Sequence, residues 1–300
     1  MTGKISALIR FSRPHTVIGT ILSITTLYIL ATTHYGISLS AKFDTLLWAL
    51  ISCLGANIFI VGLNQITDIE IDRINKPELP LASGTLAVTH AKWITGISLL
   101  VSVAIAGVQG PFLFMTVLIS LIIGSIYSLP PFRLKRFYFW AAASIFTIRG
   151  IVVNLLMFLH FSSFLDAQPT IPFHIWILTG FFFGLSLVIA WFKDIPDVQG
   201  DRLFQIRTLS VVIGSNKVFY LGLGVLTLWM VGLIYFSVVG LGELNGFILG
   251  IGNLVLLGAL WLKGLKTTPT RKKLMREYYQ FLWRIFFLEY ILFALSAFRW

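Results

Sequence analysis

Long apolar runs, separated by short polar segments, dominate this chain. A helix rises about 1.5 Å per residue, so about 20 apolar residues are needed to cross a hydrocarbon layer about 30 Å thick. Nine runs reach or approach that length: 16–33, 45–63, 93–108, 112–129, 137–161, 173–192, 218–240, 244–262 and 281–298. The pattern therefore predicts an all-α polytopic membrane protein, a bundle of nine transmembrane helices forming one domain over residues 1–300.

Composition excludes a soluble domain. Hydrophobic residues make up 57% of the chain and charged residues only 12%, about half the share usual in soluble proteins. The net charge of +11 requires no nucleic acid, because inward-facing loops beside anionic lipid headgroups account for it. The single cysteine, Cys53, falls within a span and rules out an intrachain disulfide.

The distribution of Lys and Arg predicts the orientation in the membrane. Positive residues are retained on the cytoplasmic side, and nearly all of them fall in alternate connecting segments. The other set of segments holds only Lys42 and Arg299. We therefore expect a cytoplasmic N-terminus and a C-terminus on the opposite side, as an odd number of spans requires.

The end of the second run carries the first candidate site. Asn64, Asp68 and Asp72 are four residues apart, so on one continuous helix they project from one face. Hard divalent ions such as Mg²⁺ prefer carboxylate and amide oxygens. A solvated helix end is the simpler interpretation, but the chain has only twelve acidic residues to distribute.

A second acidic cluster, Asp194, Asp197 and Asp201, ends the sixth run. Pro196 and Gly200 make an unbroken helix doubtful there. Both runs point inward, so both clusters reach the cytoplasmic face. Carboxylates flanked by cations above an apolar bundle suit a ligand with a polyanionic head and an apolar tail, and a prenyl diphosphate held through Mg²⁺ fits that description.

Two of the predicted spans contain charged residues. Arg149 lies in the fifth run and Glu289 in the ninth. Intramembrane charges mark functional sites by default, but the two lie at similar depth and a simple ion pair is the favoured interpretation. The basic residues at the inner span ends, such as Arg13, are either headgroup anchors or ligands for an anionic substrate. The last three runs are interpreted mostly as scaffold.

The polar motifs resemble those of the UbiA-type intramembrane aromatic prenyltransferases, and among them the homogentisate prenyltransferases. The stretches that carry the resemblance are RPHT at 13–16, NQITDIEIDRINKP at 64–77, LPLASG at 79–84 and KDIPDVQGDR at 193–202. The resemblance implies a helical bundle around a central cavity. It also implies two Mg²⁺ ions, one held by Asn64, Asp68 and Asp72 and the other by Asp194, Asp197 and Asp201.

The same resemblance implies an activity. A prenyl group, phytyl above all, passes from its diphosphate to homogentisate with loss of carbon dioxide, in a photosynthetic bacterial or plastid membrane. Asp68, Asp72, Asp194 and Asp197 are then the catalytic carboxylates. The expected substrate ligands are Asn64, Arg13, Tyr127, Arg133, Lys135 and Lys193, with Arg149 for the acceptor carboxylate.

Several alternatives stay open on the sequence. In the first alternative the prenyl donor is geranylgeranyl or solanesyl diphosphate. In the second the acceptor is a chlorin, as in chlorophyll synthase. A transporter for an ion or anion is the alternative of another class. It predicts charge along a transmembrane route, whereas most of the charge here gathers at one face.

Overall fold

The computed structural model describes residues 2–166 and 168–298, so Arg299 lies outside the described residues. Helices form the whole architecture of this part. They are α1 Thr2–Phe11, α2 Pro14–His34, α3 Phe43–Thr67, α4 Ile69–Asn75, α5 Val88–Gln109, α6 Pro111–Ser128, η1 Leu134–Arg136, α7 Tyr138–Phe146, the π-helix η2 Thr147–Val152, α8 Val153–Ser162, α9 Phe173–Phe192, η3 Ile195–Asp197, α10 Val198–Leu203, α11 Leu209–Ile213, α12 Ser215–Val239, α13 Gly246–Leu265 and α14 Lys272–Ser296.

The all-α polytopic prediction is confirmed. Within the described residues, eight helical segments are long and apolar enough to cross a membrane. The ninth predicted span, 281–298, falls largely in α14, which has 25 residues but carries Arg284 at its centre and Glu289 beyond it. The count of nine therefore stays a prediction.

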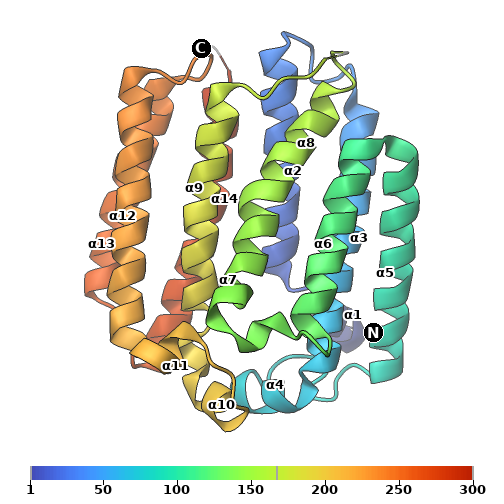
Figure 1. The fold of residues 1–300 in the computed structure, drawn as a ribbon, viewed down its shortest axis with the longest axis vertical. Coiled ribbons are helices and arrows are strands. Elements are labelled where there is room, and N and C mark those ends of the chain that lie inside the picture. The colour runs from blue at the N-terminus through green and yellow to red at the C-terminus, as the bar shows by residue number, and fades with distance from the viewer. Residues whose placement is uncertain (1, 167, 299–300) are drawn as a thin grey trace.

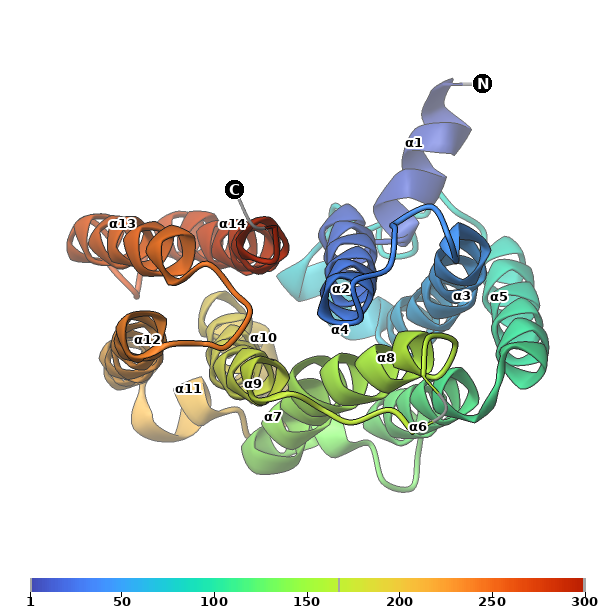
Figure 2. The same ribbon diagram turned by 90° about the horizontal axis from the view of Figure 1, so that it is seen from above.

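Six helical segments surround a central space. Going round, α2 contacts α3, α3 contacts α6, α6 contacts α8, the α7–η2–α8 segment contacts α9, α9 contacts α14, and α14 returns to α2. Figure 2, which looks along the bundle, shows this ring, with α5, α12 and α13 outside it. The ring is what creates room for a ligand within the bundle.

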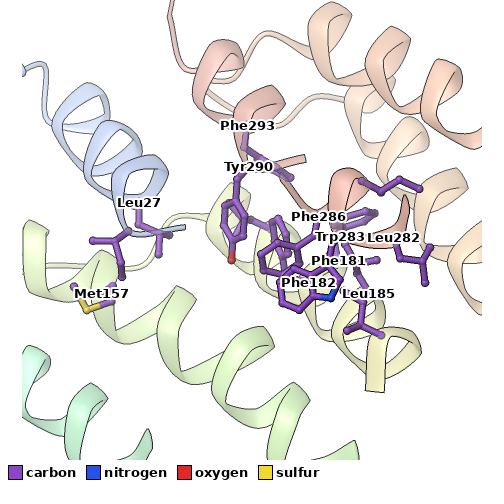
Figure 3. Packing of buried hydrophobic residues seen from close by; sticks show 14 of the residues in the cluster. Leu27, Met157, Phe181, Phe182, Leu185, Leu282, Trp283, Phe286, Tyr290 and Phe293 are labelled. Carbon is purple, nitrogen blue, oxygen red and sulfur yellow. The ribbon is translucent and has the colours of Figure 1, made fainter. Parts of the chain in front are cut away.

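One end of the ring is closed by side chains. Tyr28 of α2 meets Phe161 of α8 edge to face, with ring centroids 5.3 Å apart. Figure 3 shows Leu27 and Met157 from the same two helices facing each other, while Tyr290, Phe286 and Trp283 of α14 pack against α9. Leu27, Tyr28, Met157 and Phe161 are almost fully buried, so a ligand reaches the central space from the other end.

The short helices gather at that other end. Figure 1 shows α1, α4, α10 and α11 at one end of the bundle and the chain's C-terminal end at the opposite one. α4 holds Asp72 of the first acidic motif and α10 holds Asp201 of the second, and the two helices are in contact. Sequence positions more than 100 residues apart therefore meet above one opening.

Candidate active site

A cavity of about 290 Å³ lies inside the ring. Its lining at the short-helix end is polar and includes both acidic motifs, while deeper it becomes apolar, with Ile24, Cys53 and Val117 among the lining residues. Ile24 lies eleven residues beyond Arg13 along α2, a rise of about 16 Å. The shape is that of a pocket with a charged mouth and an apolar interior.

The first motif lines the mouth, but not on one helix. α3 ends at Thr67 and α4 begins at Ile69, so the predicted continuous helix from Asn64 to Asp72 is wrong. Asp68 sits between them at φ −115° and ψ 14°, and its carboxylate accepts a hydrogen bond from Asn64 Nδ2 at 3.0 Å. Aspartate readily makes such local bonds in place of continuing a helix. The three side chains nevertheless line the same cavity.

Two cations hold Asp68. Lys135 Nζ lies 2.5 Å from Asp68 Oδ1, and Arg133 Nη2 lies 3.3 Å from the same oxygen. Both come from the turn after α6. Lys135 lines the cavity, whereas Arg133 is not among its lining residues and contacts the motif from outside it. Burial lowers the pKa of Lys135, although the charge of Asp68 opposes that shift.

The second motif is broken, as Pro196 and Gly200 indicated. α9 ends at Phe192, η3 spans the proline and α10 carries Asp201. Asn75 Nδ2 donates to Asp201 Oδ1 at 3.4 Å. A Cβ on Gly200 would lie 2.2 Å from Asn75 Oδ1, so only glycine allows α10 to approach α4 this closely.

Lysines connect the second motif to the rest of the mouth. Lys76 Nζ, from the end of α4, lies 2.5 Å from Asp197 Oδ2. Lys193 Nζ lies 3.7 Å from Asp194 Oδ1 and donates to the Tyr127 hydroxyl at 2.5 Å. The predicted proximity of the two motifs is therefore borne out, since Lys76 follows the first and contacts the second.

The donor set suits a hard divalent ion. Asp197 Oδ1, Asp201 Oδ2 and Asn75 Oδ1 are buried oxygens without a hydrogen-bond partner. In the part of the chain that the structure describes, no three His, Cys, Asp or Glu side chains converge on one point. Mg²⁺ is usually bound through one or two carboxylates, with substrate phosphates and water completing its shell, so this spread is compatible with it.

Two opposing effects act on the pKa of the Asp72 carboxyl group. Burial raises its pKa to about 6, while the positive charges of Lys76 and Arg13 oppose the rise. Arg13 also approaches the motif directly, with Nη2 donating to Asn64 Oδ1 at 3.4 Å. A cation placed beside Asp72 favours its ionised form.

Arg149 and Glu289 do not pair, so the favoured interpretation is wrong. The Arg149 guanidinium lines the cavity and lies 5.0 Å from the centre of the Trp283 ring. Glu289 faces another surrounding, where its carboxylate accepts a hydrogen bond from Asn253 Nδ2 of α13 at 3.3 Å. Similar depth in a bundle does not bring two side chains together when they lie on different faces.

The π-helix η2 presents Arg149 to the cavity. Asn154 Nδ2 donates to the backbone oxygen of Gly150 at 2.9 Å, and Tyr290 of α14 donates to Asn154 Oδ1 at 2.7 Å. A Cβ on Gly150 would lie 2.6 Å from the Phe183 Cα, so glycine is needed where η2 touches α9. Such π segments are frequent at functional sites.

Several lining residues were missed by the sequence analysis. α14 was interpreted as scaffold, yet Tyr279, Trp283, Phe286 and Tyr290 all line the cavity. His15, Asn75 and Lys76 line it too, and their place beside the quoted motifs was the available signal. Glu70, the remaining acidic residue of the 64–72 stretch, is exposed and paired with Arg73 at 2.9 Å, outside the cavity lining.

Comparison with known proteins decides the family. A sequence model of the UbiA prenyltransferase family matches residues 20–285. The chain belongs to this family. It is therefore a membrane-embedded prenyltransferase, and the transporter alternative is wrong.

Similar proteins have been named in bacteria and plants. The chain is 45% identical to homogentisate phytyltransferase of Synechocystis sp., over 97% of this chain and 96% of the relative. It is 36% identical to homogentisate phytyltransferase 1, chloroplastic, of Arabidopsis thaliana, over 96% of this chain and 75% of the relative. A homogentisate geranylgeranyltransferase of Triticum aestivum is 35% identical, over 96% and 72%.

Solved structures share the fold. A UbiA homolog from Archaeoglobus fulgidus bound to GPP and Mg²⁺ superimposes with a TM-score of 0.65 at 17% identity, over 96% of this chain and 99% of that one. A digeranylgeranylglyceryl phosphate synthase gives the same score at 20% identity, over 98% of both chains. The helical bundle is thus common to proteins whose sequences have diverged widely.

Proposed function

We propose that this protein transfers a phytyl group from phytyl diphosphate to homogentisate, with loss of the acceptor's carboxylate as carbon dioxide, in tocopherol synthesis. The observation that carries the proposal is one cavity in which carboxylates and lysines surround the mouth and apolar side chains line the interior. The names of the similar proteins supply the acceptor and the favoured donor. One of these relatives comes from Synechocystis sp. and another is named as chloroplastic, which supports a photosynthetic bacterial or plastid membrane.

The mouth binds the diphosphate head in this proposal. Lys135, Lys193 and Arg13 line it and carry positive charge, and the Tyr127 hydroxyl adds a hydrogen-bonding group. Charge-assisted hydrogen bonds from such groups to phosphate oxygens are about twice as strong as neutral ones. Arg133 acts on the donor through Asp68, because it contacts that carboxylate and not the cavity.

Magnesium completes the head site. In this proposal Asn64, Asp68 and Asp72 would hold one ion, and Asp194, Asp197 and Asp201 would hold the other. When bound, Mg²⁺ neutralises the diphosphate and makes it a better leaving group. The solved UbiA homolog that contains both GPP and Mg²⁺ supports Mg²⁺ as the ion.

The apolar interior receives the prenyl chain and keeps water away from the reacting carbon. As the bond between the first prenyl carbon and the diphosphate oxygen breaks, positive charge develops on the allylic group. Aromatic faces lower the energy of such a cation by about 0.5 to 2 kcal/mol each. Tyr279, Trp283 and Tyr290 line the cavity and supply such faces.

Arg149 binds the acceptor carboxylate in this proposal. Its guanidinium makes no ion pair with any carboxylate of the described residues and lines the cavity. A guanidinium binds a carboxylate through two parallel hydrogen bonds, which also fixes the orientation of the acceptor ring.

The orientation in the membrane follows from the same assignment. We place the mouth and the N-terminus on the cytoplasmic side and the C-terminus on the opposite side, with residues 1–300 acting as one domain. Nearly all Lys and Arg of the connecting segments then face the cytoplasm. The placement is tested with Lys42→Cys and Arg202→Cys in sealed vesicles of known orientation. A thiol reagent that cannot cross the membrane should label position 42 only from the outer side and position 202 only from the cytoplasmic side.

The decisive experiment uses the purified protein in lipid nanodiscs with homogentisate labelled in its carboxyl group. Phytyl, geranylgeranyl and solanesyl diphosphates are supplied separately, with and without Mg²⁺. We expect a phytylated methylbenzoquinol and labelled carbon dioxide, with phytyl diphosphate used fastest and no turnover without the ion. Faster use of another donor would reassign the donor, and absence of product with every donor would refute the proposal.

A further inference from the structure

One polar residue of the cavity has no role in the mechanism above. His15 is the second residue of α2, directly after Arg13 and Pro14, and its side chain lines the cavity. Its ring meets the Trp283 indole edge to face, with centroids 4.8 Å apart. Its ring nitrogens have no hydrogen-bond partner among the described residues. An imidazole that only anchored α2 would be expected to bond a backbone or side-chain group nearby.

Arg149 shares the same indole. Its guanidinium lies 5.0 Å from the Trp283 ring centre and likewise makes no ion pair within the described residues. A cation, an aromatic wall and an imidazole with free nitrogens therefore meet around one part of the cavity. These groups match the parts of a small aromatic acid that carries a hydroxyl group, namely its carboxylate, its ring and its hydroxyl.

His15 also lies where the two substrates would meet. It is within electrostatic reach of both Arg13, which approaches the first acidic motif, and Arg149. In the proposed function Arg13 faces the diphosphate and Arg149 faces the acceptor carboxylate. The imidazole is therefore close to the region where the new bond forms, and not at the inner end of the apolar interior that receives the prenyl chain.

We propose that His15 binds a hydroxyl group of the aromatic acceptor and accepts its proton as the new carbon–carbon bond forms. The inference rests on the proposed function, because it requires a hydroxylated aromatic acceptor. An imidazole suits the task, since its ordinary pKa of about 6.5 leaves it mostly unprotonated at neutral pH. His15 is then a catalytic residue that touches the acceptor, while Trp283 positions it.

The electron balance of the step is as follows. The acceptor O–H bond breaks, its proton moves to His15, and the oxygen electron pair enters the ring. A ring carbon next to that oxygen forms a bond to the first prenyl carbon, whose bond to oxygen breaks with the electron pair leaving on the diphosphate. The substituted ring carbon then loses its hydrogen as a proton, and His15 returns its own proton to the acceptor oxygen. The bond between the side-chain carbon and the carboxylate breaks with release of carbon dioxide, and the electron pair left on the side-chain carbon takes up the proton lost by the ring, which forms the methyl group.

The test compares His15→Gln with His90→Gln, since His90 is exposed and outside the cavity lining. General-base catalysis contributes about 10²- to 10⁴-fold, so we expect kcat of His15→Gln to fall at least about 100-fold while its acceptor KM changes much less. His90→Gln should match the unmodified protein. Binding of phytyl diphosphate and the melting temperature show that each variant is folded.

A pH profile separates proton transfer from simple packing. The titratable or charged groups that line the cavity around His15 are Arg13, Arg149, Tyr279 and Tyr290, none of which ordinarily titrates between pH 5 and 8. Asp72 at the cavity mouth has a pKa raised to about 6 by burial and titrates in the same interval. We therefore expect kcat of both the unmodified protein and His15→Gln to fall with the protonation of Asp72 at low pH, and the unmodified protein alone to show a second ionisation, that of His15. Added imidazole should partly restore turnover in His15→Gly.

The two proposals fail in different ways. If the unmodified protein does not prenylate homogentisate, the proposed function fails, and the His15 comparison is repeated with whichever hydroxylated acceptor is turned over. If homogentisate is prenylated but His15→Gln keeps more than about one third of the kcat, or keeps the same pH profile, the role of His15 is refuted while the proposed function stands.

Discussion

Replacing Glu289 by glutamine separates two accounts of this buried carboxyl group. Its side chain is fully buried, with one oxygen accepting from Asn253 Nδ2 at 3.3 Å and the other oxygen without a partner. The Asn253 oxygen is also buried and unpartnered. Glutamine has the same shape, keeps the existing bond, and brings an NH₂ group beside an unpartnered acceptor.

The expected effect of Glu289→Gln on stability is therefore small or favourable. One added hydrogen bond contributes about 0.5 to 1.5 kcal/mol, so the free energy of unfolding should stay the same or rise by about 1 kcal/mol. An ion pair with Arg149 would give the opposite result, because removing one partner of a buried pair costs about 3 to 5 kcal/mol. The two accounts differ by roughly 4 kcal/mol, which a melting experiment resolves.

The measurement is thermal unfolding of the purified protein in one detergent, together with turnover of homogentisate. Glu289→Leu serves as the matched variant, because it removes the bond to Asn253 and should cost about 1 to 3 kcal/mol. A melting temperature of Glu289→Gln that drops by roughly 10 °C or more, with turnover lost, would show that the carboxylate has an ionic partner and would refute this reasoning.

Three further outcomes test the cavity. Lys135→Met should lower kcat by about 100-fold or more, whereas Arg136→Met, at an exposed neighbouring position outside the lining, should leave kcat unchanged. Cys53→Trp fills the apolar interior of the cavity, so turnover of phytyl diphosphate should fall at least about tenfold, while the shorter, ten-carbon geranyl diphosphate is still used. Equal losses for both donors would contradict the placement of the prenyl chain in this interior. Chelation of Mg²⁺ should stop turnover and added Mg²⁺ restore it. Asp68→Ala and Asp194→Ala should each abolish turnover while leaving the protein folded, so that full activity in either variant would refute the metal assignment.

The fold was largely predictable because the bilayer sets the length of each helix. Eight of the nine apolar runs coincide with helices that meet the length and composition needed to cross it. The tight turn at Gly110, with φ at +115°, joins α5 and α6 in the short gap between the runs 93–108 and 112–129. These features depend on residues close together in the chain, which a sequence displays directly.

The local breaks in the helices were not predictable. At Asp68, where α3 ends, the carboxylate is bound by Lys135, 67 residues away in sequence. The π-helix at Arg149 is supported by Asn154, whose oxygen is bonded by Tyr290, 136 residues further along. Neither partner could be chosen from the sequence, because many lysines and tyrosines lie at similar depth. The carboxylate clusters were found nevertheless, since charge is rare in this chain.

α14 shows most clearly why the sequence analysis missed part of the site. Arg276 donates to the backbone oxygen of Asn75 above the mouth, Trp283 lies against Arg149 and His15, and Tyr290 bonds Asn154 beside the π-helix. The three residues are seven apart and so share one helix face. In sequence that spacing looks like an ordinary packing stripe. In the folded ring, with α2 and α9 on either side of α14, this one face contacts Asn75 at the cavity mouth, Arg149 and His15 beside Trp283, and Asn154 beside the π-helix. A shift of α14 would therefore disturb donor and acceptor binding together.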